Sequence, residues 1–379
     1  MSRFDFDRLI DRTSTSTQKW QKYANTDILP MWVADTDFMS PPAVIEALKQ
    51  RVEHGIFGYT NTPDSLNQAF IDRMARLYGW KLTPEQLTWL PGLVSGLNLA
   101  VRASCQKNEA ALTATPVYPP FVSAPKLSQR GLIKVPMERI GDRSIIDFEA
   151  LETSITPAAK LLLFCNPHNP GGAVYRQAEL ERLAELILRH DLIICSDEIH
   201  CDLILEPGVE HVPIASLGPE IAARTITLMA PSKTWNIAGL GCSVAVIENE
   251  RLRQQFTQVR KGIVPGVNLL GFTAAEAAYR DGQEWNNQQL SYLRANRDYL
   301  VKQVNQLPGL DLRPFEATYL AWIDASGLEL ESPQKFFEAA GVGMSDGSDF
   351  GDPQFVRLNF GCPRSRLEEA IRRMQKALI

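Results

Sequence analysis

Strand-like and helical segments alternate over roughly residues 85–250 of this 379-residue chain, and this alternation restricts the fold more than any other feature. Each strand-like run is short, apolar or β-branched, and ends in a glycine, a proline or a polar turn. Such alternation is typical of βαβ units and predicts an α/β fold, a mainly parallel sheet with helices on both faces. The expected strands cover residues 86–90, 110–115, 160–165, 192–195, 225–229 and 242–247, and the expected helices residues 43–54, 64–78, 93–104 and 176–190.

The last third of the chain has a different pattern. A long helical stretch precedes two strands and a terminal helix, which is expected to begin at the capping box Ser365-x-x-Glu368. This pattern predicts a smaller α+β domain, and 379 residues are enough for two cores. We expect an irregular N-terminal segment that joins the small domain, then a large domain, then the small C-terminal domain, at residues 1–40, 41–280 and 281–379.

The composition excludes several classes of protein. A net charge of −5 without a long basic run argues against nucleic acid as a partner. No apolar stretch is long enough for a membrane span, and the first residues contain neither an apolar signal core nor a cleavage site, so we expect a cytoplasmic protein. Six scattered cysteines lack the paired spacing of a metal site, and we expect buried free thiols and no metal.

One lysine lies where an amine could react. Lys233 is in the polar turn that begins at Pro231, between the expected strands 225–229 and 242–247. Partial desolvation there would disfavour the ammonium form and free a neutral amine for attack on a carbonyl carbon. The alternative is an ordinary solvated turn lysine, and this stretch alone is compatible with both.

Other polar residues follow the expected strands, where ligands of open α/β sheets bind. Gly92 opens a helix whose first amides could hold a phosphate. Tyr118 lies between prolines and could stack on a flat ring, while Asn169 offers an amide and Asp197 a carboxylate. Each has an ordinary structural alternative when it is considered alone. Gly92 and Asn169 could be turn residues, Tyr118 could be a packing aromatic, and Asp197 could be a helix N-cap. Together with Lys233 they are what a pyridine ring carrying a phosphate, a phenolic oxygen and an aldehyde requires.

Three motifs in this order resemble those of the fold-type I pyridoxal phosphate enzymes, the aspartate aminotransferase superfamily, and the likeness covers nearly the whole chain. They are Asn166-Pro-His-Asn-Pro-Gly-Gly172, Ser196-Asp-Glu-Ile-His200 and Ser232-Lys-Thr-Trp-Asn-Ile-Ala-Gly-Leu240. The resemblance implies a large domain with a mainly parallel sheet of seven-stranded type, a smaller α+β C-terminal domain, and pyridoxal 5′-phosphate as cofactor.

The resemblance also implies roles in the cofactor site. Lys233 would bond covalently to the cofactor aldehyde, and Asp197 would keep the pyridine nitrogen protonated so that the ring withdraws electrons. Tyr118 would stack on the ring as the third catalytic residue, and Asn169 would hydrogen-bond the phenolic oxygen. The phosphate would be held by the amides of Leu93 and Val94, by Ser232, and by Tyr59 reaching the neighbouring subunit, which implies a homodimer.

Two further positions would hold the substrate. Arg357 matches the arginine that clamps the α-carboxylate of an amino acid substrate, a job suited to a bidentate guanidinium. Ala34 occupies the place where the family's backbone approaches the same carboxylate. The alternative for Arg357 is a surface arginine on an edge strand.

Within the superfamily, four segments resemble the MalY/PatB-type cystathionine β-lyases: residues 31–38, 118–121, 197–202 and 357–363. The chain also departs from most aminotransferases. Gly241 stands where they carry a phosphate-binding arginine, Ala230 where a serine is common, and His200 where many have a tyrosine beside the cofactor. The missing arginine and the histidine fit the lyase group, whereas Ala230 would weaken the phosphate contacts.

The resemblance therefore implies a pyridoxal phosphate-dependent carbon–sulfur β-lyase. Lys233 would remove the Cα proton of L-cystathionine or another cysteine S-conjugate, and the products would be pyruvate, ammonia and a thiol. The first alternative is a class I/II aminotransferase, which shares every step up to that proton removal. The second is a regulatory binding protein that uses the same fold.

Overall fold

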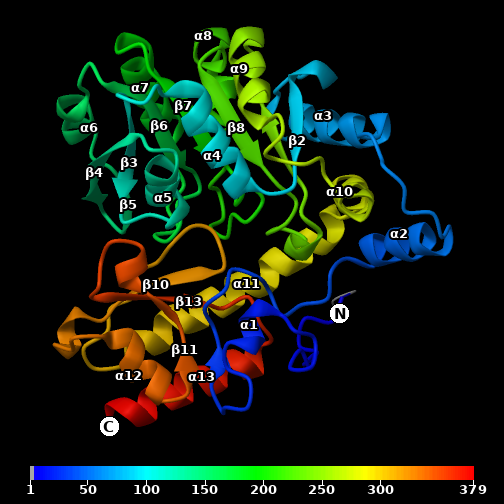
Figure 1. Ribbon diagram of the computed structural model, residues 1–379. Coiled ribbons are helices and arrows are strands. Elements are labelled where there is room, and N and C mark those ends of the chain that lie inside the picture. Colours follow the sequence, from blue (N-terminus) through cyan, green and yellow to red (C-terminus); the bar gives the residue numbers. More distant parts are fainter. Residues whose placement is uncertain (1–3) are drawn as a thin grey trace.

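The structure, a computed structural model, describes residues 4–379, and its largest element is an eight-stranded sheet (Figure 1). In spatial order the strands are β2 (Leu87–Leu90), β9 (Ser243–Val246), β8 (Thr225–Met229), β7 (Ile193–Asp197), β6 (Ala159–Cys165), β3 (Ala110–Thr115), β4 (Gly131–Ile140) and β5 (Arg143–Ile146). Strands β8 to β4 run parallel to one another, whereas β9 and β5 are antiparallel to their neighbours. The predicted mainly parallel sheet is confirmed, with β5 as an added edge strand.

Helices cover both faces of this sheet, as the alternation of the sequence predicts (Figure 1). Successive side chains of a strand point to opposite faces. Leu161 and Leu163 of β6 accordingly pack in the same core as α4 (Leu93–Ser104), whereas Leu162 between them packs in the core that contains α7 (Gln177–Arg189). The remaining α-helices between residues 42 and 282 are α2 (Pro42–Glu53), α3 (Asp64–Tyr78), α5 (Pro120–Leu127), α6 (Phe148–Ser154), α8 (Pro219–Ala222), α9 (Glu250–Arg260) and α10 (Leu269–Asp281).

The last hundred residues form a smaller antiparallel sheet with its own helices (Figure 1). Its strands are β10 (Leu320–Asp324), β13 (Phe355–Asn359) and β12 (Ser345–Asp346), and its helices are α11 (Gln283–Val304), α12 (Pro333–Ala339) and α13 (Arg364–Leu378). The α+β character predicted for this region is confirmed, while the domain boundaries stay a prediction.

The predicted capping box of the terminal helix is wrong. Helix α13 begins at Arg364, one residue before Ser365, and its N-cap is Pro363 with no side-chain cap. The amide of Arg364 instead donates to the hydroxyl of Tyr292 on α11, at 2.7 Å. A residue from another helix therefore satisfies one of the first four amides, which have no partner within the helix.

The N-terminal segment is less irregular than its sequence suggests, although residues 1–3 of the predicted range 1–40 lie outside the described residues. It contains the one-turn helix α1 (Gln18–Gln21) and the two-residue strand β1 (Leu29–Pro30). Strand β1 pairs with β11 (Val342–Gly343) of the C-terminal region. In Figure 1 the segment accordingly lies beside the C-terminal elements.

All six cysteines are free and buried, as predicted. Among residues 4–379, no helix combines the length and the apolar character needed to cross a membrane.

Candidate active site

A cavity of about 900 Å³ lies where the loops after β6, β7 and β8 meet the start of α4, the strand β13 and the N-terminal segment. It is lined by every predicted site residue except one: Ala34, Leu93, Val94, Tyr118, Asn169, Asp197, His200, Ser232, Lys233 and Arg357. The exception is Tyr59, which is fully exposed in the loop between α2 and α3. The roles of all these residues remain proposals, but the structure brings the ten together.

Lys233 lies in the loop after β8, with its amine inside the cavity. Its Nζ donates a hydrogen bond to the carbonyl oxygen of Ala34 at 2.7 Å. Desolvation lowers the pKa of Lys233 to about 8, and Arg357 adds to this while Asp35 opposes it. A useful fraction of the amine is therefore neutral near neutral pH, which is the form that attacks a carbonyl carbon.

Asp197 is the last residue of β7 and is buried. Its Oδ1 accepts a hydrogen bond from the amide of Ile199 at 3.1 Å. Burial, with a smaller contribution from the neighbouring Glu198, raises the pKa of Asp197 to about 7. A protonated ring nitrogen placed against this carboxylate would favour its ionised form, because an opposite charge compensates for desolvation.

His200 presents a free nitrogen to the same space. The side chain is buried, lines the cavity, and its Nδ1 has no hydrogen-bond partner among the described residues. Burial lowers the pKa of His200 to about 3, and the positive charges of Lys233 and Arg357 act in the same direction. The imidazole is therefore neutral, and its Nδ1 is available for a hydrogen bond to a ligand in the cavity.

Arg357 on β13 is also buried. One Nη donates to the side-chain oxygen of Asn169 at 2.9 Å, and the other to the carbonyl oxygen of Trp32 at 3.1 Å. Its Nε has no partner among the residues described. Burial lowers the pKa of Arg357 to about 10, so the group stays cationic at neutral pH and can hold a carboxylate.

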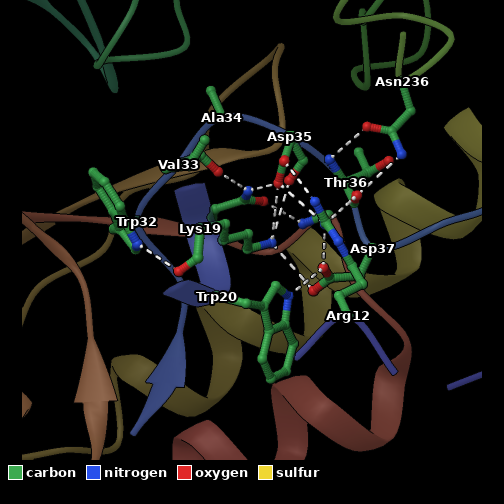
Figure 2. Close-up of polar contacts among 12 residues, drawn as sticks. Arg12, Lys19, Trp20, Trp32, Val33, Ala34, Asp35, Thr36, Asp37 and Asn236 are labelled. Carbon is green, nitrogen blue, oxygen red and sulfur yellow. Dashed lines mark hydrogen bonds and ion pairs between the residues drawn. The ribbon is translucent and has the colours of Figure 1, made fainter. Parts of the chain in front are cut away.

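Two asparagines that sequence reasoning missed hold the loop that carries Ala34. Asn236 forms two hydrogen bonds with the backbone of Thr36 (Figure 2). Its Nδ2 donates to the carbonyl oxygen of Thr36 at 3.0 Å, and its Oδ1 accepts from the amide of Thr36 at 3.1 Å. Asn359 donates to the carbonyl oxygens of Val33 and Asp35. Both asparagines lie in motifs that were noted for other residues, Asn236 near Lys233 and Asn359 near Arg357. Asn236 also has a positive φ of 55°, a conformation that asparagine tolerates.

A second missed feature is a buried carboxylate surrounded by cations. Asp37 forms ion pairs with Arg12 at 2.7 Å, Lys19 at 3.1 Å and Arg366 at 2.8 Å. Figure 2 shows Arg12 and Lys19 converging on it from the N-terminal segment. Burial alone would raise the pKa of Asp37, but the three cations lower it to about 2. The cluster therefore fixes the N-terminal segment, which forms part of the cavity wall, to α13.

We expect Asp37→Asn to lower the free energy of unfolding by about 3–5 kcal/mol, because it leaves buried cations without their partner. Since the pKa of Asp37 falls from an ordinary 3.8 to about 2, its stabilisation is present above pH 4 and is lost as the pH drops towards 2. Urea titrations of both proteins between pH 7 and pH 2 measure this difference. Glu369→Gln is the control, because this surface carboxylate pairs with Arg372 and should contribute less than about 1 kcal/mol. Equal stability of Asp37→Asn and the parent at pH 7 would contradict the assignment.

Pyridoxal phosphate fits the residues of this cavity. A reactive amine, a buried carboxylate with a raised pKa and a buried imidazole with a free nitrogen face one space. At Gly92, a Cβ would meet no atom within 4 Å, so there is room beside the first turn of α4. That helix has no side-chain cap, which leaves its first amides available for a phosphate.

Comparison with known proteins agrees with this fit. The family model for aminotransferase class I and II matches residues 26–374. The chain is 37% identical to cystathionine beta-lyase PatB of Bacillus subtilis (strain 168), over 99% of this chain and 100% of that protein. A crystal structure of OvoB superposes with a TM-score of 0.97 at 53% identity, covering 99% of both chains. The crystal structure of a PLP-bound C-S lyase from Staphylococcus hominis gives a TM-score of 0.93 at 33% identity, over 100% of this chain and 99% of that one.

Proposed function

The chain belongs to the class I and II aminotransferase family, and we propose that it is a pyridoxal phosphate-dependent carbon–sulfur β-lyase acting on cysteine S-conjugates. The observation that carries this proposal is the full-length likeness to a cystathionine β-lyase, combined with a cavity that holds Lys233, Asp197 and Arg357 together. One water is consumed, and the products are pyruvate, ammonia and the thiol.

Three residues perform the central steps. Bound pyridoxal phosphate supplies an electron-withdrawing ring. Arg357 holds the α-carboxylate of the substrate, which fixes the direction of the bonds at Cα. Lys233 takes the Cα proton, and the electron pair left behind expels the thiolate from Cβ. Asp197 keeps a proton on the ring nitrogen throughout, because an ionised carboxylate favours the positive charge there.

The other predicted residues position the cofactor. Tyr118 stacks on the ring, and its backbone amide is held by the carbonyl oxygen of Asn169 at 3.1 Å. Asn169 and His200 supply hydrogen bonds to the phenolic oxygen. Ser232 and the first amides of α4, at Leu93 and Val94, would hold the phosphate.

A class I/II aminotransferase is the second candidate, because the matching family model bears that name. We expect the purified holoenzyme to release pyruvate and a thiol from L-cystathionine without any 2-oxo acid. Lyase chemistry needs only a leaving group at Cβ, whereas transamination needs an acceptor to complete the cycle. Pyruvate and thiol assays with and without an added 2-oxo acid separate the two. L-Alanine, which has no leaving group, is the control substrate. Strict dependence on the 2-oxo acid, with no thiol released, would replace the lyase by the aminotransferase.

We also propose that the protein is a homodimer in which Tyr59 reaches the partner's cofactor phosphate. The support is the exposure of this loop: Tyr59 is fully exposed, and Ile56 and Phe57 expose 65% and 60% of their surface. Apolar side chains gathered on one loop are typical of an interface.

Tyr59→Phe should weaken pyridoxal phosphate binding by about tenfold or more without unfolding the protein, since a hydrogen bond to a charged group is worth about 1.5–3 kcal/mol. Cofactor titration of the apoprotein measures the affinity, and sedimentation measures the assembly. Tyr299→Phe on α11 is the matched control. A fully active monomer would exclude the arrangement.

A cytoplasmic location is a further part of the proposal. The six free thiols support a reducing compartment. Cell fractionation tests it.

A further inference from the structure

The carbonyl oxygen of Ala34 accepts two hydrogen bonds at the wall of the cavity. One comes from Lys233 Nζ at 2.7 Å, and the other comes from the hydroxyl of Tyr319 at 3.1 Å. A carbonyl oxygen has two lone pairs, so the two donors share one acceptor. Tyr319 has no part in the steps proposed above, yet it is the second donor to the oxygen that holds the reacting amine.

Tyr319 lies directly before β10, and its side chain is fully buried. Its ring lies edge-on to the ring of His200, with 6.4 Å between the ring centroids and 83° between the planes. Gly361 packs against it as well, because a Cβ at that glycine would lie 3.3 Å from Tyr319 Cγ. The backbone carbonyl of Tyr319 accepts a hydrogen bond from the amide of Phe360 at 2.9 Å. The hydroxyl is therefore held in its direction towards Ala34.

The residue before Tyr319 has an unusual backbone conformation. Thr318 has a φ of 74°, which is rare for a β-branched residue. Its amide donates to the carbonyl oxygen of Leu203 at 2.9 Å, and its hydroxyl oxygen accepts from the amide of Leu320 at 3.1 Å. Such a conformation persists only where the surrounding contacts impose it. These contacts set the direction in which the chain enters Tyr319.

The carbonyl group of Ala34 is also held independently of Lys233. Asn359 binds the carbonyl oxygens of Val33 and Asp35 on either side of it. When Lys233 is bonded to the cofactor, its amine is no longer free to donate to Ala34. The hydroxyl of Tyr319 still donates there, so the oxygen keeps a partner and its orientation until the amine is released.

The shared oxygen acts on the amine when the amine takes a proton. In the lyase reaction the neutral amine of Lys233 removes the Cα proton and becomes an ammonium group. A carbonyl oxygen at hydrogen-bond distance stabilises this charged form. Donation from Tyr319 draws on the same oxygen and weakens that stabilisation. The hydroxyl therefore favours the neutral amine, which is the form that acts as base and as nucleophile.

A buried tyrosine hydroxyl usually has a hydrogen-bond partner, so the bond alone assigns no role. Tyr175 is an ordinary case. It is buried, it lies outside the residues that line the cavity, and its hydroxyl oxygen accepts from the amide of Ile146 at 2.8 Å. Tyr319 differs because its partner is the oxygen that the reacting amine also uses.

We propose that Tyr319 is a positioning residue for the amine of Lys233, and that it acts through the carbonyl oxygen of Ala34 that both groups share. It aims this oxygen at the amine and favours the neutral amine. The role serves the lyase reaction and so rests on the proposed function.

Removing the Tyr319 hydroxyl leaves the charges around the amine unchanged. Burial raises the pKa of Tyr319 far above its usual range, so its hydroxyl is uncharged at neutral pH. The charged and titratable groups near Lys233 are Asp35, which is paired with Arg12, Asp197 at the end of β7, His200 after it, Tyr118 before α5, and Arg357 on β13. All of them remain in Tyr319→Phe. A shift in the titration of Lys233 therefore reports the shared oxygen.

Attachment of pyridoxal phosphate to the apoprotein tests this role without turnover. The measurement is the rate of attachment as a function of pH, for the parent and for Tyr319→Phe. In the parent this rate should level off at about pH 8, where the amine becomes neutral. In Tyr319→Phe we expect the midpoint about 0.5–1 pH unit higher, the shift that one neutral hydrogen bond supplies. Below the midpoint the variant should therefore attach the cofactor about threefold to tenfold more slowly.

The steady-state constants of the holoenzyme give a second readout. Because Arg357 still holds the substrate carboxylate, KM for L-cystathionine should stay within about twofold, while kcat falls about threefold to tenfold. A loss of folded protein would instead lower the amount of active enzyme without moving the midpoint of attachment.

Tyr175→Phe is the matched control, because it also removes a buried hydroxyl that has one backbone partner. It should leave the midpoint of attachment and kcat at the parent values. Tyr319→Met is a second variant without the hydroxyl, and its flexible side chain fills irregular space. It should show the same upward shift if Tyr319→Phe does not fold.

A midpoint in the Tyr319 variants that equals the parent value, or that moves to lower pH, would overturn the proposal. The same upward shift in Tyr175→Phe would overturn it too. If the midpoint rises but no cysteine S-conjugate yields pyruvate, the positioning of Lys233 stands and the lyase function falls. If the parent apoprotein attaches no pyridoxal phosphate, both fall.

Discussion

Lys233→Ala should lower pyruvate release from a cysteine S-conjugate by about 10⁴-fold, the upper end of what one positioned acid–base group supplies. One amine has two tasks, the covalent bond to the cofactor and the removal of the Cα proton, and the variant loses both. The nearest described groups are poor replacements for this base: His200 is buried with a pKa lowered to about 3, Asp35 is paired with Arg12, and Asp197 faces the ring nitrogen in the proposed arrangement. A turnover above a tenth of the parent value would show that another group takes the proton.

The covalent role of Lys233 can also be tested without measuring turnover. Borohydride should fix pyridoxal phosphate to the peptide that contains Lys233 in the parent protein, and the label should be absent from Lys233→Ala. Because burial lowers the pKa of Lys233 to about 8, the rate of cofactor attachment to the apoprotein should rise as the pH increases to about 8 and then level off. Lys261→Ala is the control, since this lysine is exposed. A rate that keeps rising towards pH 10.5 would mean that the amine is solvated.

Asp197→Ala should reduce kcat by at least about a hundredfold while the protein still binds the cofactor. The buried carboxylate is the group that would keep the ring nitrogen protonated, and without it the ring withdraws electrons less strongly. Binding survives because Lys233 and the first turn of α4 remain. The measurement is kcat together with the cofactor content and absorption spectrum of the variant.

Asp197→Asn is the matched comparison, because it keeps the shape and removes the charge. It should show nearly the same loss as Asp197→Ala. Turnover near the parent value in both variants would mean that Asp197 only caps the turn at Ile199, to whose amide it is hydrogen-bonded.

The large sheet was predictable because its strands are locally distinctive. Strand β8 is buried at every residue, so its sequence is a continuous apolar or β-branched run. Strand β4 was missed because most of its residues are partly or fully exposed, and its sequence therefore lacks such a run. The reactive residues were found because ligands of parallel sheets bind beyond the carboxyl ends of the strands, and the chain carries its polar turns there.

The wall built by the N-terminal segment could not be predicted from local sequence. Helix α1 has four residues and β1 two, too few for a periodic pattern. The burial of Asp37 depends on Arg366, a residue more than three hundred positions away. The resemblance pointed to residues 31–38 as a segment but not to the cations that hold it.

The origin of the cavity's outer wall bears on how such a chain can diversify. The reacting groups lie between residues 197 and 357, whereas Arg12 and Asp35 come from a segment whose described strand, β1, pairs with β11 of the C-terminal region and not with the large sheet. Exchanging the first forty residues between relatives would therefore alter the reaction centre as well, because the backbone of Trp32 and Ala34 holds Arg357 and Lys233.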